Sequence, residues 1–334
     1  MGDAIIMMRG GIKDPIASLE ITTEPTKTRY VVGEQLNLTG IEVTAIYKNG
    51  NRVNVTNACT FSPANGTALT SANKTVAISW KFGRKIYTAA QLLDVVSMSE
   101  FWEKGTDAEV VSMITAARNG QYKLSDYWKV GDKRTITLGT IEGVGGAATV
   151  QNAQVDIVIT EFGAKTLQNG TACLLQWDFA SIPIAVPMRT TDTNSGGYES
   201  SLIASWLDSK VFTALPAWLK NVSKSFYAKT SAGSGSSTVN NKIHNLCLRT
   251  EKEIFGTSYR SPAEGNANTY ITYYKTEANR KKEGSYWLAT TYYESGDTYG
   301  NSRYMCYVQS NYYGTSLTAG LASNYLGVAP YGCI

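Results

Sequence analysis

Histidine is almost absent from this chain of 334 residues, which contains only His244. A single imidazole excludes metal sites built from several histidines and leaves one candidate for a histidine base. The segment around it, KIHNLCLRT, is typical of a strand edge, so we expect a structural histidine. Carboxylate-rich calcium loops are also missing, because the last 50 residues hold only Glu294 and Asp297 as acids. We therefore expect no metal site, no cofactor and no catalytic residue.

Cysteine occurs five times, without a CxxC pair and without the spacing of a disulfide framework. We interpret all five as buried thiols: Cys59, Cys173, Cys247, Cys306 and Cys333. No GxSxG motif is present, and residues 143–146 lack the Lys-Ser/Thr pair of a phosphate loop. Asp156 with Glu161, or Asp192 with Asp297, would suit glycosidase chemistry, but nothing in the sequence brings either pair together.

Long apolar segments are missing as well. The run 4–8 follows Asp3 and is too short for the core of a signal peptide, and no window is long enough for a membrane span. We therefore expect no signal peptide and no membrane span, so a protein acting outside the cell would leave by lysis or inside a particle. The net charge of +4 is small, and the basic run 280–282 is followed by Glu283, so we expect no nucleic-acid partner.

Residues 16–98 have the period of two that half-buried strands show. Asn49-Gly50, between IEVTAIYK and NRVNVT, is the preferred pair for a two-residue hairpin, because both turn positions need positive φ. Short strands with regular turns predict a β-sandwich here. The chain length and a composition of 43% hydrophobic and 17% charged residues predict two or three folded domains.

This segment resembles the group-3 bacterial immunoglobulin-like domains at Ile21, Pro25, Lys27, Tyr30, Gly33, Glu34, Leu36, Leu38, Gly40, Val43, Ala45, Tyr47, Gly50 and Val55. The resemblance implies an all-β immunoglobulin-like sandwich over residues 16–98, preceded by a leader or attachment segment, 1–15. Such domains are spacers or decorations of bacterial surface and phage virion proteins and carry no chemistry. With Cys59 alone, this one cannot form a disulfide between its sheets.

A second segment starts near residue 101. Thr106 with Glu109 fits a capping box, and the helical series behind it ends at Asn119. TITL, VDIVIT and CLLQWDF then predict strands, whereas 198–209 and 211–221 predict two helices, the second interrupted by proline. SAGSGSST, residues 231–238, predicts a flexible surface loop.

A set of motifs in this segment resembles an uncharacterised domain family frequent in phage tail and bacterial surface proteins of the gut. The motifs are Trp102, Glu103, YWKVGD at 127–132, NSGGYESS at 194–201, Trp206-Leu207, Leu215-Pro216, GVAP at 327–330 and Cys333-Ile334. The resemblance implies an α+β C-type-lectin-like domain of the formylglycine-generating-enzyme type over 99–334. The variable proteins of diversity-generating retroelements use the same fold, which implies a variable region at 286–334. Tyr198 and Ala329 depart from the tryptophan and arginine common in relatives, so the resemblance assigns no ligand.

Tyrosine is concentrated near the C-terminus, where 14 of the 21 tyrosines lie between Tyr259 and Tyr331. Tyrosine with Ser, Gly and Asn is the composition of an antibody paratope. Filling of sheet positions is the alternative, but adjacent tyrosine pairs on a strand point to opposite faces, so one should meet solvent. We predict a ligand-binding site made of Tyr292, Tyr293, Tyr299, Asn301, Tyr304, Tyr307, Asn311, Tyr312, Tyr313, Asn324 and Tyr325. We predict buried scaffold positions at Trp287, Leu288, Val308, Val328 and Pro330.

The sequence thus predicts a non-enzymatic protein, displayed on a phage virion or an extracellular bacterial surface, that binds a host or bacterial cell-surface protein or glycan. Attachment to a virion through the N-terminal part and homo-oligomerisation stay open. The alternative is an enzyme of the formylglycine-generating type, or a cell-wall hydrolase, targeted by the immunoglobulin-like domain. A formylglycine-generating enzyme needs a cysteine pair, for which Cys306 with Cys333 is the candidate.

Overall fold

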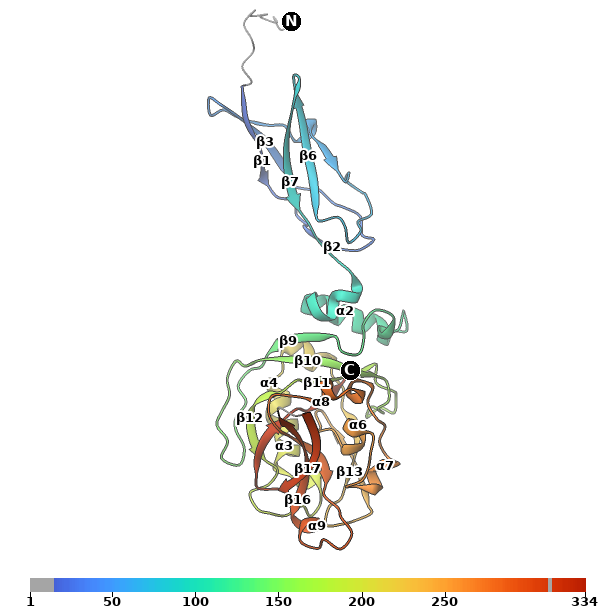
Figure 1. Cartoon of the computed structure of the whole chain (residues 1–334). Helices are drawn as coiled ribbons and strands as arrows, with labels where there is room; N and C mark the ends of the chain where they lie inside the picture. Colours follow the sequence, from blue (N-terminus) through green and yellow to red (C-terminus); the bar gives the residue numbers. More distant parts are fainter. Residues whose placement is uncertain (1–14, 312–313) are drawn as a thin grey trace, which may run out of the picture. The chain divides into compact units, whose positions relative to one another are not determined.

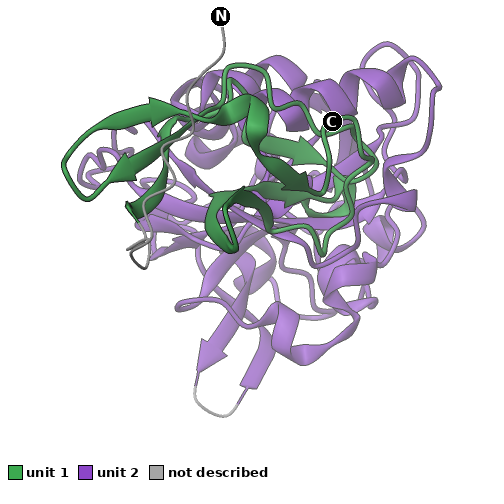
Figure 2. Cartoon of the chain, turned by 90° about the horizontal axis from the view of Figure 1, so that it is seen from above, with its two compact units in different colours: residues 1–100 green, residues 101–334 purple. Residues whose placement is uncertain are grey.

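A computed structural model describes residues 15–311 and 314–334 of the chain. The chain forms two compact units, of which the first ends at Glu100 and the second runs from Phe101 to Ile334 (Figures 1 and 2). The predicted contacts Tyr312 and Tyr313, and residues 1–14 of the expected leader, lie outside the described residues. Within the described ranges, no helix is both long and apolar enough to cross a membrane.

The first unit is built almost wholly from strands. Its elements are β1 (Ile16–Thr23), β2 (Arg29–Val31), β3 (Glu42–Tyr47), β4 (Arg52–Asn54), η1 (Thr56–Ala58), β5 (Thr60–Ser62), β6 (Thr75–Phe82), β7 (Lys85–Leu92), β8 (Asp94–Val96) and η2 (Met98–Glu100). The strand orders are β1-β3-β4 and β5-β6-β7, and β2 pairs with β8 in parallel. Alternate side chains of β3 and β6, such as Val43, Val76 and Ile78, are fully buried in one shared core. The predicted alternation thus places one face of β3 and one face of β6 inside a β-sandwich.

The predicted hairpin forms between β3 and β4, but its loop is longer than expected. The Tyr47 backbone N–H donates to the Asn51 carbonyl oxygen at 2.8 Å, so three residues lie in the loop. Only Gly50 has positive φ, at 86°, and Asn49 does not. The prediction of a two-residue turn is therefore wrong, because a three-residue loop needs a left-handed residue only at its last position.

The second unit mixes strands with short helices. Its strands are β9 (Lys133–Thr137), β10 (Gln154–Phe162), β11 (Leu175–Phe179), β12 (Ile182–Pro187), β13 (Phe226–Ser231), β14 (Val239–His244), β15 (Tyr286–Thr291), β16 (Tyr304–Asn311), β17 (Gly314–Leu321), β18 (Tyr325–Val328) and β19 (Tyr331–Cys333). Its α-helices are α1 (Phe101–Lys104), α2 (Asp107–Arg118), α3 (Leu202–Trp206), α4 (Phe212–Ala214), α5 (Ala217–Val222), α6 (Glu251–Phe255), α7 (Pro262–Gly265), α8 (Glu277–Arg280) and α9 (Gly300–Arg303). Other helical turns are η3 (Leu124–Asp126), η4 (Tyr198–Ser200), η5 (Leu207–Val211) and η6 (Thr272–Lys275).

Three sheets organise this unit. The strand orders are β19-β11-β10-β9, β12-β18-β15-β16-β17, and the hairpin β13-β14. One face of the five-stranded sheet buries Leu288, Cys306 and Val308 against Ile254 of α6 and Tyr274 of η6. The five predicted scaffold positions are all buried, as expected: Trp287, Leu288, Val308, Val328 and Pro330.

The helix predictions hold in part. The capping box is confirmed, since the Thr106 hydroxyl accepts from the Glu109 N–H at 3.3 Å and α2 ends before Asn119. The two helices expected within 198–221 are wrong in their division. Helical backbone runs from α3 through the π-helical turn η5 to α4, across the boundary expected near residue 210. The expected interruption by Pro216 is confirmed, since α4 ends at Ala214 and α5 begins at Ala217.

Candidate ligand-binding site

The predicted tyrosines differ widely in exposure. Tyr299 and Tyr325 are exposed, with 52% and 51% of their surface accessible. Half-buried positions are those of Tyr293, Tyr304 and Tyr307. Tyr292 is only 7% exposed, so the expectation of a surface side chain is wrong there. Its ring packs in the same hydrophobic cluster as Leu288, because the apolar pattern of β15 continues into it.

Six side chains form a continuous row, which we name the tyrosine–arginine row: Tyr259, Arg260, Tyr292, Tyr304, Tyr299 and Arg303. The Arg260 guanidinium lies 4.7 Å from the ring centroids of both Tyr259 and Tyr292. The ring centroid of Tyr304 lies 5.6 Å from that of Tyr292 and 5.9 Å from that of Tyr299, edge to face. The Arg303 guanidinium lies 4.4 Å from the Tyr299 ring. Because Tyr259 is 66% and Tyr299 52% exposed, the row offers aromatic surface on both sides of its buried member.

Glu294 connects the row to the loop between β15 and α9. Its carboxylate accepts from Arg260 Nη1 at 2.6 Å and from the Tyr292 hydroxyl. Burial and this hydrogen bond raise the pKa of Tyr292 to about 12, and the same bond, with that from Arg260, lowers the pKa of Glu294. The side-chain oxygen of Asn301 accepts from the Glu294 backbone N–H at 2.7 Å, and its side-chain nitrogen donates to the Glu294 carbonyl oxygen at 2.8 Å. In the free protein, Asn301 therefore shapes this loop.

Buried carboxylates fix the other loop that carries the row. Glu251 is fully buried and accepts from the Tyr259 N–H at 2.7 Å and the Arg260 N–H at 2.8 Å. Thr290 of β15 links the two acids, since its hydroxyl accepts from the Glu251 N–H and donates to Glu264, each at 2.7 Å. Burial raises the pKa of Glu264 to about 7, although hydrogen bonds from Thr290 and from residue 231 oppose this shift. The backbone at 259–260 is thus anchored to β15.

Sequence reasoning missed Tyr259, Arg260 and the two acids beneath them. Tyr259 belongs to the tyrosine-rich region, but the predicted site begins only at Tyr292. The sequence did contain one indication, because Tyr259 and Arg260 are neighbours and an arginine beside a tyrosine can stack on a further tyrosine. No sequence pattern shows that α6 brings this pair to the end of β15.

A loop from another part of the chain completes the surface. Asn194 is fully buried, and its side-chain amide donates to the Tyr304 carbonyl oxygen at 2.8 Å and accepts from the Ser234 N–H at 2.9 Å. Gly233 packs against it so closely that a Cβ there would lie 1.9 Å from the Asn194 carbonyl oxygen. The loop predicted to be flexible is therefore tied to the start of β16. Beside it, Tyr293 lines a small pocket.

The other predicted contacts do not join the row. Tyr307 lies three residues after Tyr304 on β16, so it points to the opposite face, where its ring meets buried Trp287 at 5.9 Å. Asn311 lies seven residues after Tyr304, roughly 23 Å along the strand. Asn324 and Tyr325 are exposed, and the Tyr325 hydroxyl donates to the Gly145 carbonyl oxygen. The described residues of the predicted site therefore do not all lie on one face, because successive side chains of β16 point to opposite faces of the sheet.

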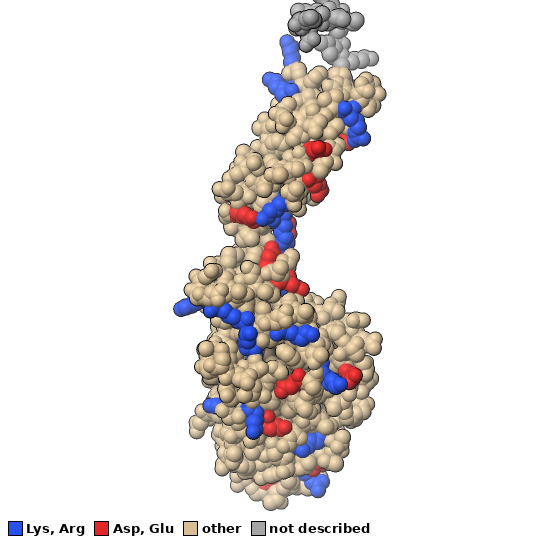
Figure 3. Space-filling view, turned by 180° about the vertical axis from the view of Figure 1, so that it is seen from behind, with Lys and Arg blue, Asp and Glu red and all other residues tan. Residues whose placement is uncertain are grey.

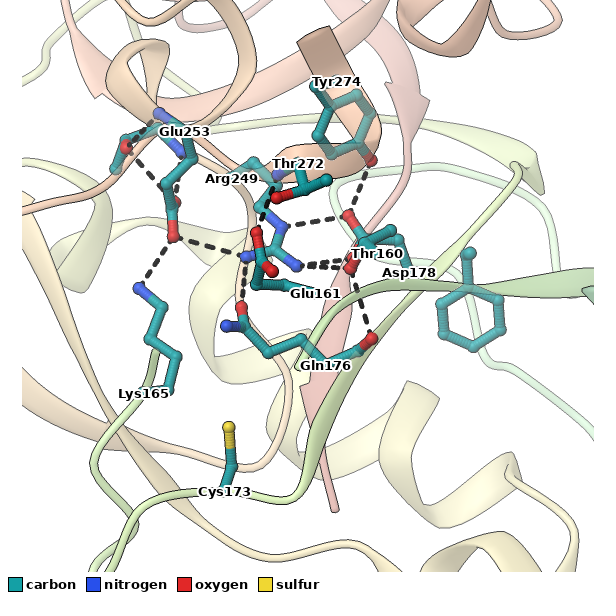
Figure 4. Close-up of polar contacts among 12 residues, drawn as sticks. Thr160, Glu161, Lys165, Cys173, Gln176, Asp178, Arg249, Glu253, Thr272 and Tyr274 are labelled. Atoms are coloured by element: carbon teal, nitrogen blue, oxygen red, sulfur yellow. Dashed lines mark hydrogen bonds and ion pairs between the residues drawn. The ribbon is translucent and has the colours of Figure 1, made fainter. Parts of the chain in front are cut away.

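A second polar cluster is buried and forms part of the scaffold (Figure 4). Arg249, 1% exposed, donates to Asp178 at 2.6 and 3.0 Å and to Glu253 at 3.3 Å. Lys165 Nζ lies 2.7 Å from Glu253, and the Tyr274 hydroxyl donates to Asp178 at 2.6 Å. The cluster ties β11 to α6 and η6, and its charges are paired as buried ions must be.

His244 has carboxylates on both ring nitrogens. Nδ1 lies 2.9 Å from Asp208, which belongs to the π-helical turn, and Nε2 lies 3.0 Å from Glu199. Burial opposes the positive charge of His244, but these two hydrogen bonds outweigh it and raise its pKa to about 9. At neutral pH this imidazole is therefore protonated, and it has no free lone pair with which to act as a base.

Cys306 and Cys333, the candidate cysteine pair of a formylglycine-generating enzyme, have different surroundings. Cys333 of β19 hydrogen-bonds to Cys173, whereas Cys306 lies in the apolar cluster of β16. Cys306 and Cys333 are both fully buried, and burial raises the pKa of each thiol well above its ordinary value. Neither presents a thiolate to solvent. Among the described residues, no cluster of three or more His, Cys, Asp and Glu side chains could hold a metal ion.

Comparison with known proteins identifies part of the first unit. The family described as bacterial Ig-like domain (group 3) matches residues 23–59. Together with the sandwich of β1 to β8, this match makes the first unit an immunoglobulin-like domain. No curated protein matches the chain.

Proposed function

We propose that this chain is a non-enzymatic binding protein, displayed on a phage virion or a bacterial surface, that attaches to a protein or glycan on a target cell. The observation that carries the proposal is the tyrosine–arginine row. Buried Glu251 holds the backbone of exposed Tyr259, and buried Asn194 holds the backbone of Tyr304, against whose ring the exposed Tyr299 packs. Rigid aromatic surface of this kind is what binding sites use, and an exposed aromatic cluster costs solubility unless it has a partner.

The proposal extends to the fold of the second unit, as a C-type-lectin-like module of the formylglycine-generating-enzyme type. Its support is that the motif residues Asn194 and Gly197 occupy positions that the packing demands. A Cβ on Gly197 would lie 1.9 Å from the Ser231 carbonyl oxygen. The immunoglobulin-like domain fits the same proposal, as a spacer between this module and the particle or cell that displays it.

Diversification of the kind found in retroelement variable proteins would affect only one part of the tyrosine–arginine row. Tyr292, Tyr299, Arg303 and Tyr304 lie within 286–334, whereas Tyr259 and its neighbour Arg260 precede it. Under diversification, the row has a variable part and a constant part. Gene sequences from related isolates test this: substitutions should concentrate at adenine-containing codons of 286–334 and leave 259–260 unchanged. Variation spread evenly over the second unit would contradict it.

On the face shown in Figure 3, basic and acidic side chains of the second unit are interspersed. This face therefore shows no patch of one charge that would suggest a different binding surface. The formylglycine-generating form of the enzyme alternative requires a reactive thiol, and a thiol-labelling assay with and without copper tests for one. We expect Cys306 and Cys333 to stay unlabelled in the native chain, because both are fully buried. Copper-dependent labelling of either would favour the enzyme.

Attachment to cells is the direct test of the proposed function. The fluorescently labelled full chain is added to a panel of gut bacterial strains and bound fluorescence is measured by flow cytometry. We expect saturable binding to at least one strain, displaced by an excess of unlabelled chain. Unsaturable or absent binding across the panel would contradict the proposal.

A further inference from the structure

A pocket of about 190 Å³ lies beside the row and is formed by three segments of the second unit. Its lining consists of residues 235–237, residues 261–263, Thr291 and Tyr293. Tyr293 directly follows Tyr292 of the row along the chain and Ser261 directly follows Arg260, so the pocket adjoins the row. The pocket is smaller than the ~300 to 1,000 Å³ typical of sites for drug-sized ligands, so it takes one ring or one side group of a larger ligand.

The lining is rich in hydroxyl groups and has no charged side chain. Ser261 is 5% exposed and lines the pocket, yet within the described chain its hydroxyl makes no hydrogen bond. The hydroxyls of Ser237 and Tyr293 likewise have no partner among the described residues. The Ser261 hydroxyl is therefore available to a ligand that can donate or accept a hydrogen bond.

The pocket walls are held in place before any ligand arrives. A Cβ added to Gly235 would lie 3.6 Å from the Tyr293 ring, so the 235–237 wall faces the aromatic wall across a narrow gap. Thr291 at the floor shares a 2.5 Å hydrogen bond with Ser231. The 232–237 loop is anchored by the buried amide of Asn194. Little ordering is therefore needed on binding, which favours affinity.

We propose that this pocket binds one ring of an uncharged sugar, with the Tyr293 ring against the apolar face of the sugar and serine hydroxyls bonding its hydroxyls. This inference rests on the proposed attachment function and names its ligand class. An anionic group would find no cation in the lining, and a cation would find no carboxylate. Because all the lining donors and acceptors are hydroxyl, backbone or aromatic groups, the contact needs no metal ion.

Ligand-observed saturation-transfer NMR on the full chain tests the inference. The probes are the methyl glycosides of glucose, galactose, mannose and N-acetylglucosamine, with methyl glucuronide as a charged comparison. We expect transfer to at least one neutral glycoside, unchanged by EDTA, and none to the glucuronide. Absence of transfer to every neutral glycoside, loss of transfer in EDTA, or equal transfer to the glucuronide overturns the inference.

Variants locate the binding. Ser261→Ala and Tyr293→Ala should each weaken glycoside binding at least tenfold, whereas Ile243→Ala, at an exposed position of β14 outside the row and the pocket lining, should leave it unchanged. Thermal unfolding of each variant shows whether it is folded, and Ser237→Ala, on the loop wall, repeats the test if Ser261→Ala does not fold. Undiminished binding by the folded pocket variants overturns the inference.

The two proposals fail separately. Saturable cell attachment without glycoside binding leaves the proposed function standing and removes the sugar pocket. Absence of attachment from the whole panel counts against the proposed function, on which the inference rests.

Discussion

The side-chain amide nitrogen of Asn194 donates a 2.8 Å hydrogen bond to the carbonyl oxygen of Tyr304, 110 residues further along the chain. The oxygen of the same amide accepts from the Ser234 N–H. One buried side chain thus holds both the start of β16, where Tyr304 of the row lies, and the 232–237 loop that borders the pocket.

Replacing Asn194 should therefore loosen both segments. Asn194→Ala removes one of the two hydrogen bonds to the Tyr304 carbonyl oxygen, which keeps its bond from the Tyr292 N–H, and leaves the Ser234 N–H without its partner. The loss of a partner from a polar group costs about 1 to 3 kcal/mol. We expect the free energy of unfolding to fall by about 2 to 4 kcal/mol in urea denaturation. Ser195→Ala, at the exposed neighbouring position, should change it by less than about 0.5 kcal/mol. Equal stability of the two variants would contradict this role of Asn194.

Alanine variants of Trp287 and Tyr299 should distinguish a scaffold residue from a contact residue. Trp287 is 1% exposed and its indole N–H donates to the Val186 carbonyl oxygen at 2.9 Å. Trp287→Ala should lower the free energy of unfolding by about 3 to 5 kcal/mol, as for other buried aromatics. Tyr299→Ala should stay within about 0.5 kcal/mol, measured by thermal unfolding. A Trp287→Ala protein of normal stability would show that the roles are reversed.

The buried cluster around Arg249 should matter more than an exposed ion pair. Arg249→Ala leaves Asp178 buried without its cation, and breaking a buried pair in this way costs about 3 to 5 kcal/mol. The control, Lys210→Ala, breaks an ion pair with Glu142 in which both side chains are about half exposed or more. Such pairs contribute at most about 1 kcal/mol. Urea denaturation of both variants gives the comparison, and similar losses would refute the assigned role of Arg249.

Stability should decrease as pH rises from 5 to 9. Glu264 has a folded pKa of about 7, above its ordinary 4.5, so it keeps its proton more readily when folded. This contribution is full below pH 4.5 and is lost as pH rises to 7. His244 has a folded pKa of about 9, above 6.5, so its contribution is full below pH 6.5 and is lost toward pH 9. Each is on the order of 3 kcal/mol.

Urea denaturation at pH 5, 7 and 9 measures this profile. Glu264→Gln should flatten the decrease between pH 5 and 7, because the amide does not titrate, and should leave the decrease between pH 7 and 9. A wild-type profile that rises over this range, or a Glu264→Gln profile unchanged from wild type, would contradict the assignment.

Local signals predicted local structure well. The capping box at Thr106 and the alternation of β3 and β6 follow from contacts within a few residues, so the sequence carries them directly. The turn at Asn49 was misjudged in length because the same residue pair fits both two- and three-residue loops.

The candidate site could be predicted only in part. Tyrosine enrichment indicated the region, and Tyr299 is exposed as expected. Burial of Tyr292 depends on packing against Leu288 and the Arg260 stack, which no periodicity reveals. Tyr259 enters the row because its neighbour Arg260 stacks on Tyr292, 32 residues further along the chain, a long-range relationship that one sequence does not show.

The most direct test of the account is attachment by the double variant Tyr259→Ala/Tyr299→Ala, measured by flow cytometry on a strain that the wild-type chain binds. Interface anchors typically contribute 2 kcal/mol or more, so we expect the apparent Kd to rise at least tenfold. The control Ile243→Ala removes an exposed side chain of β14, 42% accessible, that lies outside the row, and it should bind as wild type. Unchanged attachment by the folded double variant would contradict the central claim that the tyrosine–arginine row is the contact surface.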